Sequence, residues 1–242
     1  MKKVLLIDSG TGGANILLSC VKEVPYCDYL LFCDNKNLPY GNRSKEELIE
    51  ITLNNLHRIK IFFDFDIVIF ACNTLTATAI EKCREIFADK IFIGTEPAIL
   101  PALRKFKQED VCVLATKTTI KNNKLCQKYK NIKYRSIDSL ALLIDDNIDD
   151  LTVLNSYLIN EFSSIKENAI VFGCTHYTSV QPILEPLLPN KVFFSSEEGV
   201  AKRLKAVVGE ESGENYKIQV ITSQDGEFRD KILWYLNEKR PF

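Results

Sequence analysis

Two cysteines follow buried apolar strands in similar surroundings, and they are the residues of this chain best suited to acid–base chemistry. Cys72 follows the apolar run 67–71, and Cys174 follows the similar run 169–173. Each thiol stands between a strand and a helix, where the helix dipole and the free N–H groups of the first turn favour the thiolate. A free thiol titrates near about pH 8.5, so modest help gives a useful thiolate fraction at neutral pH.

Neutral hydrogen-bond donors accompany both thiols. They are the amide of Asn73 and the hydroxyls of Thr74, Thr175 and Ser9. The N–H groups at a helix start also bind carboxylates. A site that combines acid–base thiols with several neutral donors suits a small anionic amino acid.

A weak internal repeat places the two thiols in related halves of the chain. Besides the two cysteine segments, the run 4–9 is echoed more loosely by the run 111–116. Each half therefore offers one thiol and one polar group at the carboxyl ends of parallel strands, where open α/β sheets bind ligands. Two such halves facing each other enclose a cleft with a thiol on each wall.

Racemisation of an amino acid needs a base on one face of Cα and an acid on the opposite face. A matched pair of cysteines fits this symmetric task, because one thiolate removes the α-proton and the other thiol delivers a proton from behind. No lysine lies in a recognisable pyridoxal-phosphate context. The sequence therefore predicts a racemase that needs no cofactor.

Other interpretations of these residues compete with the two-thiol hypothesis. A cysteine after a strand is often a packed core residue, because free cysteine is among the most buried residue types. His176 could instead activate Cys174 as a nucleophile, although near neighbours on a loop rarely align well. A phosphatase loop is excluded, because Thr78 and Val180 stand where its arginine would be.

The segment Gly10-Thr11-Gly12-Gly13 follows the first strand. It meets neither the dinucleotide-binding pattern nor the P-loop pattern. Its glycines permit a tight turn that brings Asp8 and Ser9 into the cleft.

Short apolar runs alternate with helical patterns, which predicts an α/β fold with mainly parallel sheets. We expect strands at 4–7, 29–33, 67–71, 91–94, 111–115, 169–173, 191–194 and 217–221. We expect helices at 14–21, 44–63, 76–87, 98–105, 119–129, 151–162, 179–188, 198–208 and 228–237. Ser44 and Glu47 have the spacing of a capping box, which makes this helix start the clearest boundary.

Composition excludes several classes of function. The chain of 242 residues has 31 basic and 32 acidic side chains and a net charge of −1, so it lacks the basic footprint of nucleic-acid binding. No apolar run is long enough to cross a membrane, and residues 4–7 are too short for the core of a signal peptide. We therefore expect a cytoplasmic protein with neither a nucleic-acid nor a membrane partner.

Eight cysteines are expected to remain free thiols, because the chain carries no recognisable export signal. They are Cys20, Cys27, Cys33, Cys72, Cys83, Cys112, Cys126 and Cys174. No C-x-x-C pair occurs, and no metal site is predicted.

Six motifs stand in order between the first strand and about Gly199. They are Asp8-Ser9-Gly10-Thr11-Gly12-Gly13, Pro39-Tyr40-Gly41, Ala71-Cys72-Asn73-Thr74, Glu96-Pro97-Ala98, Thr118-Thr119-Ile120 and Gly173-Cys174-Thr175-His176-Tyr177. Together they resemble the glutamate racemase family. The resemblance implies two pseudo-symmetric α/β domains with the active-site cleft between them. It places residues 1–94 and 196–242 in a discontinuous first domain and 95–195 in the second.

The resemblance also implies a function. The family interconverts L- and D-glutamate without a cofactor, and D-glutamate feeds bacterial peptidoglycan synthesis. It further implies that the protein is a homodimer. The substrate would be a small molecule, glutamate.

Site residues are carried over by motif. Asp8 and Ser9 would bind or orient the substrate, with Asp8 tuning Cys72, and Tyr40 and Gly41 would line the pocket. The carboxylates and amine of the substrate would be held by Asn73, Thr74, Thr118 and Thr175. His176 would assist Cys174.

The chain departs from the family pattern at three places. Asp145, in Leu142-Leu143-Ile144-Asp145, stands where the family has a glutamate that supports the His176 side, so its carboxylate has a shorter reach. Thr178 replaces a proline, and Leu75 replaces a small residue beside Cys72. Both thiols remain in place.

Two alternative functions follow from the same residues. One is an aspartate or broad-specificity amino-acid racemase, against which the Thr-His pair after Cys174 favours glutamate. The other is a binding protein with the racemase fold and little turnover, acting on a protein such as DNA gyrase. The presence of both cysteines argues against this second alternative.

Overall fold

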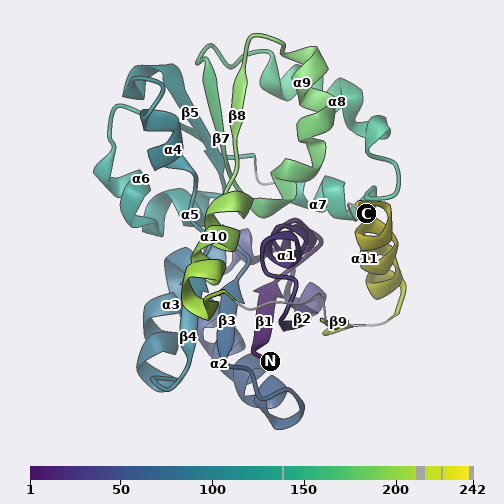
Figure 1. Cartoon of the computed structure of the whole chain (residues 1–242). Coiled ribbons are helices and arrows are strands. Elements are labelled where there is room, and N and C mark those ends of the chain that lie inside the picture. Colours follow the sequence, from purple (N-terminus) through teal and green to yellow (C-terminus); the bar gives the residue numbers. More distant parts are fainter. Residues whose placement is uncertain (138, 211–215, 225, 240–242) are drawn as a thin grey trace.

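Two parallel sheets organise the chain (Figure 1). The computed structural model describes residues 1–137, 139–210, 216–224 and 226–239. Sheet A has the strand order β4-β3-β1-β2-β9, and sheet B has the order β6-β5-β7-β8. The strands are β1 (Lys3–Asp8), β2 (Asp28–Cys33), β3 (Ile67–Phe70), β4 (Ile91–Gly94), β5 (Val111–Ala115), β6 (Lys133–Arg135), β7 (Ala169–Gly173), β8 (Val192–Phe194) and β9 (Ile218–Thr222).

All eight predicted strands are present, and the paired strands in the described residues run parallel. The α/β fold class is confirmed. The short strand β6 was not predicted, because its three residues are Lys133, Tyr134 and Arg135 and carry no apolar run.

Burial on both faces explains why the strands read as continuous apolar runs. Alternate side chains of one strand enter different cores, so Leu6 belongs to a core shared with sheet B while Leu5 belongs to a core on the other face of sheet A. In sheet B, Leu114 joins the shared core and Val113 joins a third cluster. The shared core therefore holds the two sheets together.

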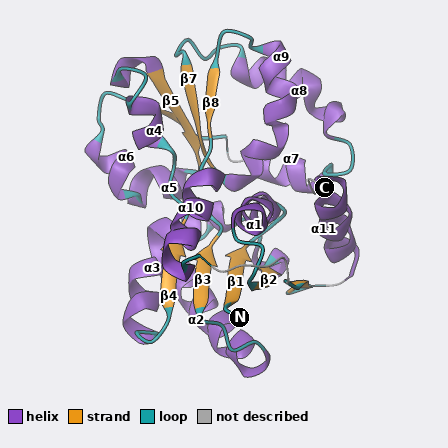
Figure 2. Ribbon diagram, viewed as in Figure 1, coloured by secondary structure: helices purple, strands orange, loops and turns teal. Residues whose placement is uncertain are grey.

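Helices cover the sheets and fill the space between them (Figure 2). Helices α1 and α10 lie between the two sheets and contact each other, and α1 also contacts η5. The α-helices are α1 (Gly12–Glu23), α2 (Lys45–Phe62), α3 (Asn73–Ile86), α4 (Ile99–Leu103), α5 (Lys117–Asn122), α6 (Lys124–Lys128), α7 (Leu140–Asp146), α8 (Asn155–Phe162), α9 (Gln181–Leu187), α10 (Glu197–Val208) and α11 (Gly226–Lys239). The 3-10 helices are η1 (Asn35–Asn37), η2 (Tyr40–Asn42), η3 (Gln108–Asp110), η4 (Leu151–Leu154) and η5 (Thr175–Val180).

Three predicted helices are divided in the structure. The helix expected at 119–129 is two helices, because the side chain of Asn123 accepts hydrogen bonds from the N–H groups of Leu125 (2.9 Å) and Cys126 (3.2 Å) and starts α6 anew. Such side-chain capping competes with a continuous helix. The helix expected at 151–162 begins as η4, and the one expected at 179–188 begins within η5.

Helix α7 was not predicted. Its seven residues, Leu140–Asp146, are too few to show a clear helical period. The helix contacts η5 and carries Asp145, so this omission concerns the site as well as the fold.

The capping box at Ser44 is confirmed. The Ser44 hydroxyl accepts from the Glu47 N–H at 3.2 Å, and the Glu47 carboxylate accepts from the Ser44 N–H at 2.9 Å. Two N–H groups that lack partners inside α2 are thereby satisfied.

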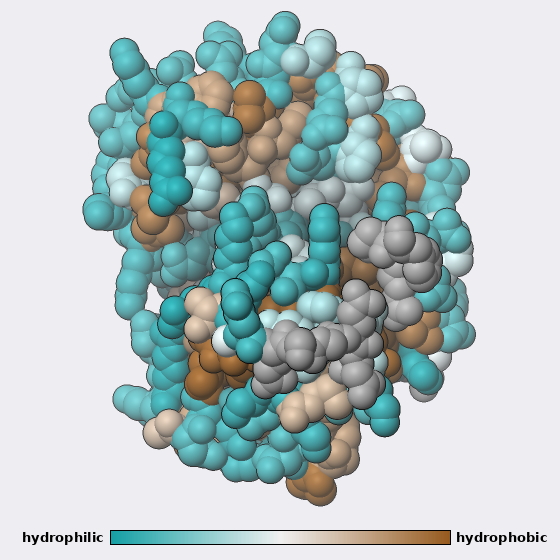
Figure 3. Space-filling view, viewed as in Figure 1, coloured by the Kyte–Doolittle hydropathy of each residue, from teal (hydrophilic) through white to brown (hydrophobic). Residues whose placement is uncertain are grey.

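All eight cysteines are free thiols, as predicted, and all are buried except the half-buried Cys174. The face of the molecule in Figure 3 is mostly hydrophilic, with hydrophobic patches between the hydrophilic residues. Among the described helices, none has the length and apolar character that a membrane span requires.

Replacing Ser44 with alanine removes one half of the capping box. We expect Ser44→Ala to lower the free energy of unfolding by about 1 kcal/mol, measured by urea denaturation. Ser44→Asp keeps a side-chain acceptor at the same position and should retain most of the stability. Equal losses in both variants would show that the cap does not stabilise α2.

Candidate active site

Cys72 and Cys174 line the same pocket. Cys72 follows β3 and caps the start of α3, while Cys174 follows β7 and caps the start of η5. Because β3 belongs to sheet A and β7 to sheet B, the pocket lies between the two halves. Its lining is Ser9, Leu38, Pro39, Tyr40, Gly41, Asn42, Cys72, Thr74, Thr116, Ala141, Cys174 and His176.

His176 connects Cys174 to Asp145. The imidazole Nδ1 lies 3.7 Å from the Cys174 sulfur, and Nε2 lies 3.1 Å from Asp145 Oδ2. Burial alone would lower the pKa of His176, but the Asp145 carboxylate and the Cys174 sulfur on its two nitrogens hold that pKa well above its ordinary value. The imidazole is therefore positively charged at neutral pH.

Asp145 reaches the site despite its short side chain. Its Oδ1 accepts hydrogen bonds from the N–H and the hydroxyl of Thr11, at 2.9 and 2.5 Å, and its Oδ2 faces His176. The carboxylate is buried, with 2% of the residue exposed. Asp145 thus joins the glycine-rich turn of one half to the histidine of the other.

Asp8 lies beneath the pocket and is fully buried. Its carboxylate accepts from the Ser9 N–H at 2.6 Å and from the Thr175 hydroxyl at 3.0 Å. Burial raises the pKa of Asp8 to about 6, while His176 and these two hydrogen bonds oppose the rise.

The Cys72 thiol is in a less favourable environment for negative charge. Burial, and next Asp8, raise the pKa of Cys72 well above its ordinary value, and Cys174 adds to the rise. Hydrogen bonds from the N–H groups of Leu75 and Thr74, at the start of α3, act in the opposite direction. In the closed pocket Cys72 is therefore a neutral thiol.

The loop that carries Tyr40 and Gly41 forms one wall. The Tyr40 hydroxyl donates to Asp34 Oδ2 at 2.8 Å. The Thr118 hydroxyl donates to the Gly41 carbonyl at 2.8 Å, and Thr118 is not part of the lining.

Threonine hydroxyls gather on another side of the pocket. Thr74 lies 2.9 Å from Thr116 and 3.1 Å from Thr119, measured between hydroxyl oxygens. The neighbouring Asn73 instead donates its amide to the Thr95 carbonyl at 3.2 Å. Hydroxyls can donate or accept, so this group offers neutral donors to an anion.

Known proteins of one kind resemble this chain throughout its length. Glutamate racemase of Clostridium acetobutylicum is 30% identical over 244 aligned positions, which cover 94% of this chain and 93% of the relative. Glutamate racemase 2 of Bacillus subtilis is 36% identical over 220 positions, covering 86% and 82%. No protein-family model matches the chain.

The chain belongs to the glutamate racemase family. Among solved structures, glutamate racemase of Campylobacter jejuni has a TM-score of 0.83 at 25% identity and covers 99% of this chain and 100% of its own. The Escherichia coli glutamate racemase, solved with L-glutamate and the activator UDP-MurNAc-Ala, has a TM-score of 0.84 at 24% identity, covering 98% and 94%. Family membership makes the protein an isomerase with two α/β halves.

The predicted residues divide into those on the pocket wall and those behind it. Ser9, Tyr40, Gly41, Cys72, Thr74, Cys174 and His176 line the pocket. Asp8, Asn73, Thr118, Asp145 and Thr175 lie behind the wall, and four of these five hold a wall residue or its immediate neighbour through hydrogen bonds.

Several residues that shape the site were not predicted. Thr116 lines the pocket, and the echo between runs 4–9 and 111–116 makes it the counterpart of Ser9, so a signal for it existed. Asp34 accepts hydrogen bonds from Tyr40 and Asn55, six and 21 positions away. Thr11 contacts Asp145 across 134 positions, and no local pattern marks such a contact.

The pocket between the thiols is small. Its free volume is about 20 Å³, which is room for one water molecule. An amino acid is much larger, so the pocket must widen before a substrate of the family can enter.

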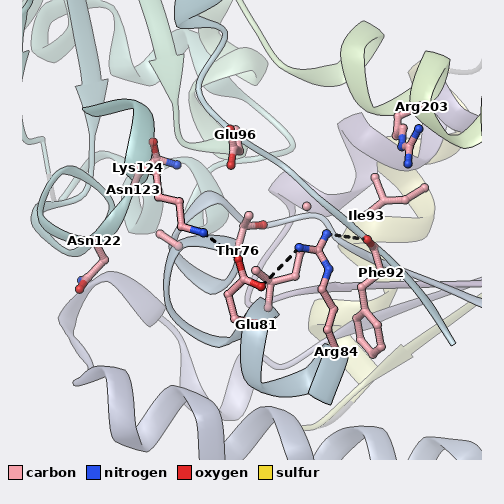
Figure 4. Close-up of a pocket in the computed structure, with 13 residues that line it drawn as sticks. Thr76, Glu81, Arg84, Phe92, Ile93, Glu96, Asn122, Asn123, Lys124 and Arg203 are labelled. Carbon is pink, nitrogen blue, oxygen red and sulfur yellow. Dashed lines mark hydrogen bonds and ion pairs between the residues drawn. The ribbon is translucent and has the colours of Figure 1, made fainter. Parts of the chain in front are cut away.

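A larger pocket lies away from the thiols (Figure 4). Its volume is about 290 Å³. Glu81 bridges Lys124 at 2.9 Å and Arg84 at 3.7 Å along its edge. None of the predicted site residues is among those lining it, so chemistry and not size distinguishes the thiol pocket.

The buried carboxylate of Asp8 makes stability depend on pH. Its pKa is about 6 in the folded protein and about 3.9 in an unfolded chain, so the folded state holds this proton more tightly. The resulting stability is present below about pH 4 and is lost as pH rises through about 6, a loss of about 3 kcal/mol.

Asparagine cannot ionise, so we expect Asp8→Asn not to lose stability as pH rises through about 6. Urea unfolding of both proteins from about pH 4 to about pH 7 measures the difference. The variant should gain stability relative to the wild type as pH rises. Parallel pH dependence in the two proteins would contradict the raised pKa.

Proposed function

We propose that this chain interconverts L- and D-glutamate by a two-thiol acid–base mechanism. The observation that supports it most strongly is that Cys72 and Cys174 come from different sheets and line one pocket. A carbon atom held between them would have one sulfur on each face. The names of the relatives from Clostridium acetobutylicum and Bacillus subtilis favour glutamate as the substrate.

The two thiols have different surroundings. The charged His176 imidazole carries a proton on each nitrogen, so Nε2 donates to Asp145 and Nδ1 faces the Cys174 sulfur. Cys72 is a neutral thiol. We therefore propose that the reaction starts with Cys174 as the base and Cys72 as the acid.

The reaction moves two protons and no other group. With the substrate Cα between the sulfurs, the thiolate removes the α-proton and the opposite thiol delivers its proton to the other face. Each turnover exchanges the roles of the two thiols. The reverse reaction uses the same groups in the opposite order.

Neutral donors hold the anionic ends of the substrate. Ser9, Thr74 and Thr116 present hydroxyls to the pocket, and the N–H groups at the start of α3 add donors for a carboxylate. Thr118 fixes the Gly41 wall, and Thr175 fixes Asp8 beneath the pocket. Asn73 supports the turn after Cys72 through Thr95.

We place residues 1–94 and 196–242 in one domain and 95–195 in the other. This division follows the two sheets and puts the pocket at their junction. The D-glutamate would serve peptidoglycan synthesis. The homodimer implied by the family stays a prediction, which light scattering of the purified protein tests.

Each thiol should be essential in both directions. We expect Cys72→Ala and Cys174→Ala each to lower the racemisation rate by at least about 10²- to 10⁴-fold, the usual contribution of a general acid or base. Circular dichroism follows the conversion of L- and D-glutamate, and heavy water reports uptake of deuterium at Cα. Aspartate, assayed in parallel, tests the alternative substrate.

Cys83→Ala provides the matched control. Cys83 is a buried cysteine of the same helix α3 that does not line the pocket, so this variant should keep its activity. Near-normal activity in Cys72→Ala or Cys174→Ala would remove that thiol from the mechanism. A wild-type protein that exchanges no α-deuterium would instead be a binding protein.

We also expect racemisation to need no added cofactor. Activity should be unchanged after dialysis against a metal chelator and without pyridoxal phosphate. Activity that is lost on dialysis and returns with a metal ion or pyridoxal phosphate would refute the cofactor-independent mechanism.

A further inference from the structure

Thr11 makes a contact with Asp145 that the two-thiol mechanism does not use. Both hydrogen-bond donors of Thr11, its N–H and its hydroxyl, are directed at the single oxygen Oδ1 of Asp145, at 2.9 and 2.5 Å. The other oxygen, Oδ2, is thereby turned to His176. All three residues are almost fully buried. Water therefore cannot replace either donor easily.

We propose that Thr11 is a positioning residue, which fixes the Asp145 carboxylate so that His176 stays charged and oriented beside Cys174. The inference rests on the proposed function, because Cys174 has a catalytic task only there. Thr11 itself does not line the pocket. It acts through Asp145 and then through His176.

The Thr11 hydroxyl contacts Asp145 and does not cap helix α1. Thr11 stands at the N-cap of α1, where a threonine side chain commonly accepts a hydrogen bond from the first turn. Here no side-chain cap is formed, and the hydroxyl donates to Asp145 instead. A helix N-terminus also attracts carboxylates, so the start of α1 suits this contact.

The turn around Thr11 is fitted closely to the histidine. A Cβ on Gly10 would lie 2.3 Å from Asp145 Oδ2 and 2.4 Å from His176 Nε2. A Cβ on Gly12 would lie 2.8 Å from His176 Nδ1. Glycine at both positions is needed for the backbone to bring Thr11 this near.

The contact joins the two halves of the molecule. Thr11 lies between β1 of sheet A and α1, whereas Asp145 and His176 belong to the half that contains sheet B. The pocket has room for only about one water, so it must widen for substrate to enter. Thr11 holds Asp145 in the arrangement that the structure shows, with the two halves in contact.

The groups that face His176 are few. Among the described residues they are Asp145 on α7, Cys174 directly after β7 and Asp8 on β1. Asp145 gives the direct contact to Nε2, and its orientation depends on Thr11. A change at Thr11 should therefore appear in the titration of His176.

Nuclear magnetic resonance of histidine-labelled protein tests this directly. The chain has two histidines, and His57 is exposed on α2, so its signal is an internal reference. We expect Thr11→Val, which keeps the N–H and the shape, to lower the pH at which His176 titrates by about 1 unit. His57 should titrate unchanged.

The kinetic constants of the Thr11 variants distinguish a positioning role from a merely structural one. We expect Thr11→Val to lower kcat about 10-fold or more in both directions, with little change in KM. Thr11→Ser restores a hydroxyl and should recover most of the activity. Thr52→Val is the matched control, because the buried Thr52 hydroxyl donates only to the Leu48 carbonyl of its own helix.

The outcomes are separable. A His176 titration that is unchanged or raised in Thr11→Val, or a kcat equal to that of Thr52→Val, would overturn the role of Thr11. A wild-type protein that fails to racemise glutamate would overturn the proposed function, and the histidine titration would still report whether Thr11 controls His176.

Discussion

His176 and Asp145 meet as an almost fully buried pair, and the imidazole could not remain charged there without the groups around it. Burying an isolated charge is costly, so the charged imidazole persists because Asp145 and Cys174 face its two nitrogens. Thr11 provides two donors to the carboxylate, and Cys174 lies at the second nitrogen of the imidazole. The positive charge beside Cys174 therefore depends on a chain of contacts that crosses the molecule.

The two thiols occupy equivalent places in the repeat but unequal surroundings. Cys72 is close to Asp8, a buried acid that opposes negative charge on sulfur. Cys174 is close to the charged His176. The two thiols therefore lie in an asymmetric electrostatic field, with a buried acid near one sulfur and a charged imidazole near the other. Each half contributes a carboxylate, but Asp8 acts beneath the pocket and Asp145 acts through an imidazole.

The division into halves creates the site and also limits access to it. Sheet A brings Cys72, Asp8 and Ser9, and sheet B brings Cys174 and His176. The shared core and helices α1 and α10 hold the halves together, leaving little free volume between the thiols. Exclusion of water strengthens every charge interaction in the pocket, and it requires opening for substrate exchange.

The sequence by itself determined the described strands other than β6, the free thiols and the helix start at Ser44, because these follow from local patterns of apolar residues, glycines and caps. It also pointed to Cys72 and Cys174, since each follows a buried strand in a repeated context. Tertiary structure alone decided which residues meet: Asp145 lies on a helix too short to show a period, and its contact with Thr11 joins segments 134 positions apart. It likewise decided that Thr118 and Tyr40 donate their hydroxyls to the Gly41 carbonyl and to Asp34, while Thr116 lines the pocket. Such pairings arise when two separately patterned halves pack together, and no local pattern in either half records them.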